Sequence, residues 1–121
     1  MSNDEGAGSG RYDLEERCAK FGESVIEFCK GVHLSVISTP LVGQLVRSGT
    51  SVGANYCEAD DSSSKKSFKH CIGIRKREAR ESKYWLRMIV KAEPPMRDQA
   101  KPLWVEAKEL HLIFSKIYRS M

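Results

Sequence analysis

Basic side chains are concentrated between residues 65 and 91, in a spacing that could bind a polyanion. This segment holds ten of the chain's twenty Lys and Arg residues and two of its sixteen acids, Glu78 and Glu81, so it carries a net +8 while the rest of the chain carries −4. At about 100° per residue, eight of the basic residues share one helix sector that contains neither acid. These eight, called the basic stripe below, are Lys65, Lys66, Lys69, Lys76, Arg80, Lys83, Arg87 and Lys91.

On a helix the basic stripe would extend for roughly 39 Å. A face of this length without an acid predicts contact with a polyanion, and nucleic acid is the polyanion that fits it best. The alternative is a solvated helix face whose charge is balanced by acids on neighbouring helices.

Catalytic chemistry has little support in the residue pattern. The sequence contains no GxxxxGK loop and no HExxH motif. His33, His70 and His111 are scattered, and no Glu is followed three residues later by His, as a di-iron bundle would require. We therefore expect a protein without enzymatic activity, metal or cofactor.

The four cysteines are Cys18, Cys29, Cys57 and Cys71, and they form no CxxC pair. Each has apolar neighbours at helical spacing, which favours buried free thiols in a reducing cytoplasm, with a zinc site or a disulfide as alternatives. The sequence has no run of about eighteen apolar residues, so we expect no membrane span and a cytoplasmic location.

Apolar residues recur with helical spacing along four segments. The seams begin at Leu14, Val42, Phe68 and Leu103 and step by three and four residues. Thr39 and Pro40 predict the N-cap and first turn of the second helix, and Glu93-Pro94-Pro95 ends the third near residue 92. The pattern predicts an all-α, antiparallel up-and-down four-helix bundle over residues 11–121, preceded by a disordered leader at 1–10.

The second of these helices also carries polar residues at heptad spacing. With Arg47 close to the same sector, the set is Gln44, Arg47, Ser48, Ser51, Asn55 and Glu58. We expect a structural network of hydrogen bonds to a neighbouring helix or at an interface, with a solvated stripe or a ligand site as alternatives.

The third and fourth helices have apolar residues outside their core seams. A second face of this kind usually marks a subunit contact, so we expect a homo-oligomer. The predicted interface residues are Ile74, Trp85, Met88, Trp104, His111 and Tyr118.

Residues 44–59, QLVRSGTSVGANYCEA, resemble the signature of the four-helix-bundle proteins encoded in intervening sequences of bacterial 23S ribosomal RNA genes. Residues 64–68, 84–86 and 109–117 add to the resemblance, which covers roughly residues 11–120. It implies a bundle that assembles as a homopentameric ring. That family is in turn similar to the accessory variability protein of diversity-generating retroelements, a basic pentamer that binds nucleic acid and works with a reverse transcriptase.

The sequence thus predicts a non-enzymatic, sequence-independent binder of RNA or RNA–DNA. Its expected partners are further copies of itself and nucleic acid, and the resemblance implies a reverse transcriptase as a further partner. The alternative is an oligomeric scaffold that binds an acidic protein surface and no nucleic acid.

Overall fold

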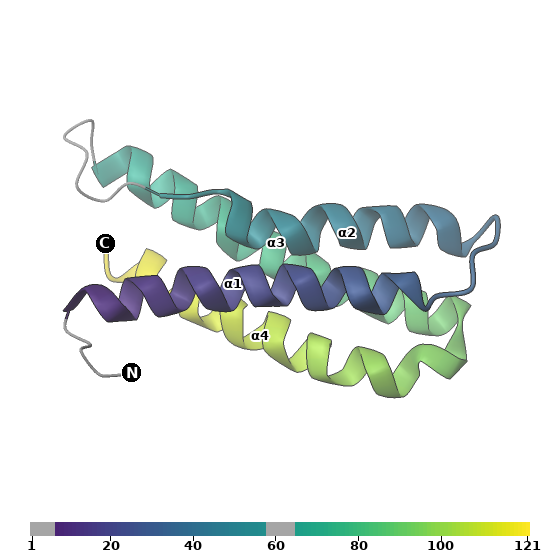
Figure 1. Cartoon of the computed structure of the whole chain (residues 1–121). Coiled ribbons are helices and arrows are strands. Elements are labelled where there is room, and N and C mark those ends of the chain that lie inside the picture. Colours follow the sequence, from purple (N-terminus) through teal and green to yellow (C-terminus); the bar gives the residue numbers. More distant parts are fainter. Residues whose placement is uncertain (1–6, 58–64) are drawn as a thin grey trace.

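The structure is a computed structural model, and it describes residues 7–57 and 65–121. These residues form four helices, α1 (Ala7–Lys30), α2 (Ser38–Ala54), α3 (Lys65–Ala92) and α4 (Arg97–Arg119), with the short 3-10 helix η1 (Pro94–Met96) between the last two and no strand in the described ranges. The helices lie side by side, and the α1–α2 and α3–α4 connections are at the same end of the molecule (Figure 1). None of these helices is long and apolar enough to cross a membrane.

The helix boundaries differ from the predicted ones in two places. Residues 7–10, predicted as part of a disordered leader, belong to α1, because a helix docked downstream extends past its buried part at little further cost. Thr39 is not the N-cap of α2, because the helix already begins at Ser38. In the turn before it, Ser35 Oγ accepts hydrogen bonds from the backbone N–H groups of Ile37 and Ser38 at 3.1 and 3.0 Å. The remainder of the predicted leader lies outside the described residues.

The close packing of α1 against α2 depends on glycine. A Cβ added at Gly49 would lie 2.9 Å from Val25 Cγ2, and one at Gly53 would lie 3.2 Å from Cys18 Cβ. A Cβ at Gly43 would meet nothing within 4 Å. The close approach of α1 therefore explains Gly49 and Gly53, whereas Gly43 has open space beside it.

Arg75 occupies the centre of the apolar core with 1% of its surface exposed. From α3 it donates to both carboxylate oxygens of Glu15 on α1 and, through Nε, to the Val52 carbonyl near the end of α2 at 2.7 Å. Its guanidinium also lies 4.7 Å from the centre of the Phe114 ring on α4. One side chain therefore links α3 to the other three helices.

The prediction of four free thiols is wrong. Cys57, just after α2, forms a disulfide with Cys71 on α3, and their Cα atoms are 5.8 Å apart. Cys18 and Cys29 are free and buried. The pairing depends on where the end of α2 meets α3, which spacing along the chain does not reveal. Cysteine usage consequently no longer indicates a reducing compartment.

Candidate nucleic-acid interface

The basic stripe lies along the part of α3 that faces away from α1. Among the described residues, α3 lies next to α2 and α4, while α1 lies next to the same two helices and diagonally opposite α3, with no close backbone approach between α1 and α3. All eight stripe residues are exposed or half-buried. The acidic residues of α1 therefore lie across the bundle and do not cover the basic stripe.

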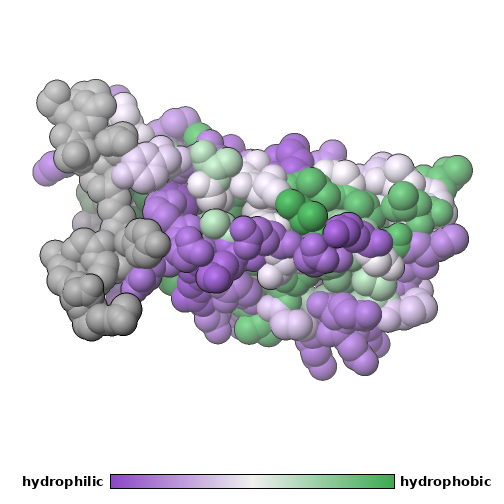
Figure 2. All heavy atoms as spheres, viewed as in Figure 1, coloured by the Kyte–Doolittle hydropathy of each residue, from purple (hydrophilic) through white to green (hydrophobic). Residues whose placement is uncertain are grey.

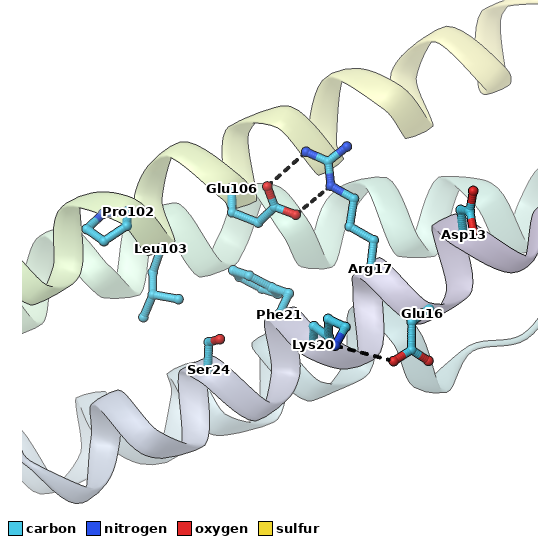
Figure 3. Close-up of a pocket in the computed structure, with 9 residues that line it drawn as sticks. All are labelled: Asp13, Glu16, Arg17, Lys20, Phe21, Ser24, Pro102, Leu103 and Glu106. Carbon is cyan, nitrogen blue, oxygen red and sulfur yellow. Dashed lines mark hydrogen bonds and ion pairs between the residues drawn. The ribbon is translucent and has the colours of Figure 1, made fainter. Parts of the chain in front are cut away.

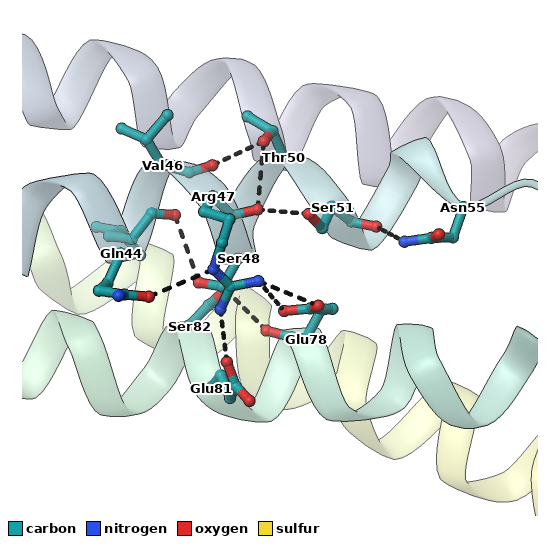
Figure 4. A network of polar contacts seen from close by, with 11 residues as sticks. Gln44, Val46, Arg47, Ser48, Thr50, Ser51, Asn55, Glu78, Glu81 and Ser82 are labelled. Carbon is teal, nitrogen blue, oxygen red and sulfur yellow. Dashed lines mark hydrogen bonds and ion pairs between the residues drawn. The ribbon is translucent and has the colours of Figure 1, made fainter.

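No residue of the basic stripe forms an ion pair within the described part of the chain. The cations that do so are Arg17, Lys20, Lys30, Arg47 and Arg75. The two acids of α3 are held on its other flank, where Arg47 from α2 reaches Glu78 at 3.2 Å and Glu81 at 2.7 Å (Figure 4). Balancing of the stripe by acids of neighbouring helices, the alternative left open by the sequence, is not seen among these residues.

Aromatic residues of α4 lie against the basic stripe. The ammonium groups of Lys69 and Lys76 are 4.6 and 4.8 Å from the centre of the Tyr118 ring, and that of Lys83 is 5.2 Å from the Trp104 ring. The sequence could not show this, because the partners are on different helices. Tyr118 and Trp104, which the sequence predicted at the oligomer interface, therefore share one face with the basic stripe, which it predicted to bind nucleic acid.

The other predicted interface residues are more dispersed. Ile74 and His111 line a pocket beside the stripe together with Lys76 and Arg80. Trp85 and Met88 are half-buried, and the Trp85 ring packs edge-on against Tyr84 at 5.0 Å between centroids. The buried Nε1 of Trp85 has no hydrogen-bond acceptor among the described residues.

Part of the predicted polar network connects α2 to α3, and the rest consists of hydrogen bonds within α2 (Figure 4). Arg47 donates to Gln44 at 3.3 Å as well as to the acids of α3, and Ser48 Oγ lies 3.0 Å from Ser82 Oγ in the α2–α3 contact. Ser51 and Asn55 instead bond to carbonyls of α2 itself, those of Arg47 and Ser51. Glu58 lies outside the described residues.

Glu78 and Glu81 shift the pKa of Arg47. Partial burial lowers the pKa of Arg47, but the hydrogen bonds and charges of the two acids raise it by more. The pKa of Arg47 is therefore above its ordinary value. Arg47 therefore stays charged and keeps both acids away from the basic stripe.

Residues 49–53, GTSVG, match the letters of the GxSxG motif found at the nucleophile of many hydrolases. That motif works at a sharp turn between a strand and a helix, which exposes the serine. Ser51 instead lies inside α2, and its Oγ donates to the Arg47 carbonyl at 2.6 Å. The serine is therefore not placed as a nucleophile.

A second surface hollow, with a volume of about 430 Å³, lies between α1 and α4 (Figure 3). Arg17 spans it and holds Glu106 through two hydrogen bonds of 2.6 and 2.8 Å, while Phe21 and Leu103 form its apolar floor. No group of three or more His, Cys, Asp or Glu residues in the described ranges could hold a metal.

The face seen in Figure 2 has hydrophilic residues along α1 and apolar residues toward the end where α1 meets α2. Leu34, Val36 and Ile37 in the α1–α2 connection are 57%, 94% and 67% exposed. An apolar tip of this kind is a candidate protein contact.

Together the fold and the site define an all-helical protein whose third helix carries a basic face without acidic partners in the described ranges. The chain belongs to the 23S rRNA-intervening sequence protein family, which matches residues 12–116.

A similar solved structure is a protein with unknown function from the S23 ribosomal protein family from Bacteroides thetaiotaomicron VPI-5482, determined at 1.70 Å resolution. It is 26% identical, the similarity covers 87% of this chain and 97% of that one, and the TM-score is 0.73. No curated protein is significantly similar to the chain.

Proposed function

We propose that this protein binds nucleic acid through the basic stripe, without catalysis and without reading base sequence. The observation that carries the proposal is that all eight stripe residues lack an ion-pair partner among the described residues, while the acids of α3 are paired with Arg47 on the opposite flank. Lys and Arg side chains along a helix neutralise phosphates and release counterions, which gives affinity that depends on salt and little on sequence. RNA and RNA–DNA hybrids are the proposed ligands.

We further propose an antiparallel up-and-down bundle that assembles as a homopentameric ring. The position of the α1–α2 and α3–α4 connections at one end supports the first part (Figure 1). The second part rests on the family resemblance and the exposed apolar tip at Leu34, Val36 and Ile37. A ring would repeat the basic stripe and multiply its effect on binding.

The subunit contact is proposed at Trp85, Met88 and the apolar tip. Trp104 and Tyr118 fit a contact less well, because Lys83, Lys69 and Lys76 lie over their rings. Burying these ammonium groups between subunits without acids would carry a large desolvation penalty. The α3–α4 face therefore remains free for nucleic acid.

Binding is tested by fluorescence anisotropy with labelled RNA, DNA and hybrid duplexes across a salt series. The combined change Lys76→Glu, Arg80→Glu and Lys83→Glu should abolish binding without altering helix content. The matched control is Lys20→Glu, Lys30→Glu and Lys101→Glu, which changes the net charge equally but off the stripe, and it should retain most of the affinity. No binding by the wild-type protein at low salt, or equal loss in both variants, would reject the proposal.

Assembly is tested by light scattering at micromolar concentration. The wild-type protein should have the mass of a pentamer, and Trp85→Glu should reduce it with most of the helix content kept. A monomeric wild-type protein at high concentration would contradict the ring.

The second candidate is a scaffold whose basic stripe binds an acidic protein surface. Arg77 and Arg80, which line a pocket with Tyr118, would also suit such a surface, and a reverse transcriptase is the protein partner that the resemblance implies. Competition separates the two functions: RNA should displace a bound acidic protein if nucleic acid is the ligand, and should fail to do so if the scaffold is correct.

A further inference from the structure

A pocket with a volume of about 310 Å³ opens beside the basic stripe, between α3 and α4. It has the size of the smaller ligand sites of proteins. Five of its lining side chains carry nitrogen donors, and only two of the five belong to the basic stripe. The five are His70, Lys76, Arg77, Arg80 and His111.

The wall of the pocket is built by contacts between the two helices. A Cβ added at Gly73 would be 3.2 Å from Cε2 of Tyr118, so the ring lies almost on the α3 backbone. His111 Nδ1 is 3.2 Å from the Lys76 carbonyl, and because a carbonyl only accepts, Nδ1 is the donor. These contacts hold an aromatic ring and an imidazole in place beside Lys76.

The charge of the pocket has no balancing acid in the described part of the chain. Its lining contains no Asp or Glu, and none of its five nitrogen-bearing side chains forms an ion pair there. On α4, Glu106 and Glu109 are both bound by Arg17 on the α1 side. A small ligand with high negative charge would therefore complement the pocket.

We infer that this pocket binds a terminal phosphomonoester, the group found at a phosphorylated strand end or on a free nucleotide. Such a group carries close to two negative charges and three free oxygens, whereas a phosphodiester inside a strand carries one charge. Guanidinium groups such as those of Arg77 and Arg80 bind phosphate through paired hydrogen bonds. The inference rests on the proposed function for its choice of strand ends.

The test compares duplexes of one sequence that carry a 5′-phosphate, a 3′-phosphate or only hydroxyl ends, with a nucleoside monophosphate as competitor. The wild-type protein should bind one phosphorylated duplex about tenfold more tightly than the hydroxyl duplex. Arg77→Gln should remove this preference and leave binding of the hydroxyl duplex within about twofold. Arg87→Gln is the matched control, since both arginines are exposed on α3 and only Arg77 lines the pocket; it should keep the preference.

The outcomes separate this inference from the proposed function. Equal binding of all three duplexes would overturn the inference that the pocket binds a phosphomonoester, and it would leave the proposed binding of nucleic acid by the basic stripe unaffected. Binding of the nucleotide without binding of any duplex would support the phosphomonoester site and overturn the proposed binding of nucleic acid. Displacement of the phosphorylated duplex by low concentrations of the nucleotide would identify a free nucleotide as the ligand, and its absence would identify the strand end. A preference that survives Arg77→Gln would also overturn the inference.

Discussion

The Arg75 guanidinium on α3 meets the Glu15 carboxylate on α1 through two hydrogen bonds of 2.8 and 2.9 Å, across 60 residues of sequence. Burial lowers the pKa of Arg75, but the hydrogen bond and charge of Glu15, together with the Cys18 side chain, raise it by more, so the arginine remains charged inside the core. The pair joins diagonal helices that have no backbone contact with each other among the described residues. It therefore fixes which helices of the bundle face one another.

Replacing Arg75 should destabilise the protein strongly. Arg75→Met would leave the Glu15 carboxylate and the Val52 carbonyl without their partner, at a cost of about 3 kcal/mol or more. Glu15→Gln keeps a hydrogen-bond acceptor and should cost less, about 1–2 kcal/mol. Urea unfolding followed by far-UV circular dichroism measures both, and equal stability of Arg75→Met and wild-type protein would show that the pair contributes nothing.

Two glycines of α2 should respond oppositely to alanine. At Gly49 the new methyl would lie 2.9 and 3.0 Å from the methyl groups of Val25, so Gly49→Ala should destabilise by about 1–3 kcal/mol. At Gly43 nothing lies within 4 Å, so Gly43→Ala should stabilise by up to about 1 kcal/mol through helix propensity. Thermal unfolding of the two variants tests the close α1–α2 packing, and effects of the same sign would contradict it.

Reduction of the Cys57–Cys71 disulfide should lower the free energy of unfolding. The bond spans 14 residues, and closing a loop of this length in the unfolded chain contributes about 3 kcal/mol. A reducing agent should therefore lower the melting temperature of the wild-type protein and leave that of Cys57→Ala/Cys71→Ala unchanged. Two free thiols should be counted in the unfolded, unreduced protein; four would disprove the disulfide.

Alkaline pH should destabilise the protein through Cys29. Burial raises the pKa of the Cys29 thiol from 9.0 to about 11. Above pH 9 the unfolded chain ionises this thiol while the folded chain does not, so stability falls as the pH rises from 9 toward 11 and then levels.

Cys29→Ala is the control for this effect, because it retains every other group that titrates in the same range. Its unfolding free energy, measured by urea titration on both sides of pH 9, should fall less than that of the wild-type protein. Parallel curves for the two proteins would show that Cys29 has an ordinary pKa in the folded state.

The sequence alone determined the helices and the basic stripe. Both depend on a period of about 3.6 residues, a local property of one chain segment. This is why Ile72, Arg75 and Leu86, which continue the steps of three and four residues from Phe68, are on the buried side of α3, and why α3 ends before Glu93-Pro94-Pro95 as predicted.

Only the tertiary structure decided which groups meet across helices. The Cys57–Cys71 bond, the capture of Glu78 and Glu81 by Arg47, and the lysines over Tyr118 each join different elements. Such pairs depend on helix order, rotation and axial offset, which are set by the packing of all four helices together. For the same reason, Trp104 and Tyr118 carried an apolar signal in the sequence, but their place beside the basic stripe became visible only when α4 packed against α3.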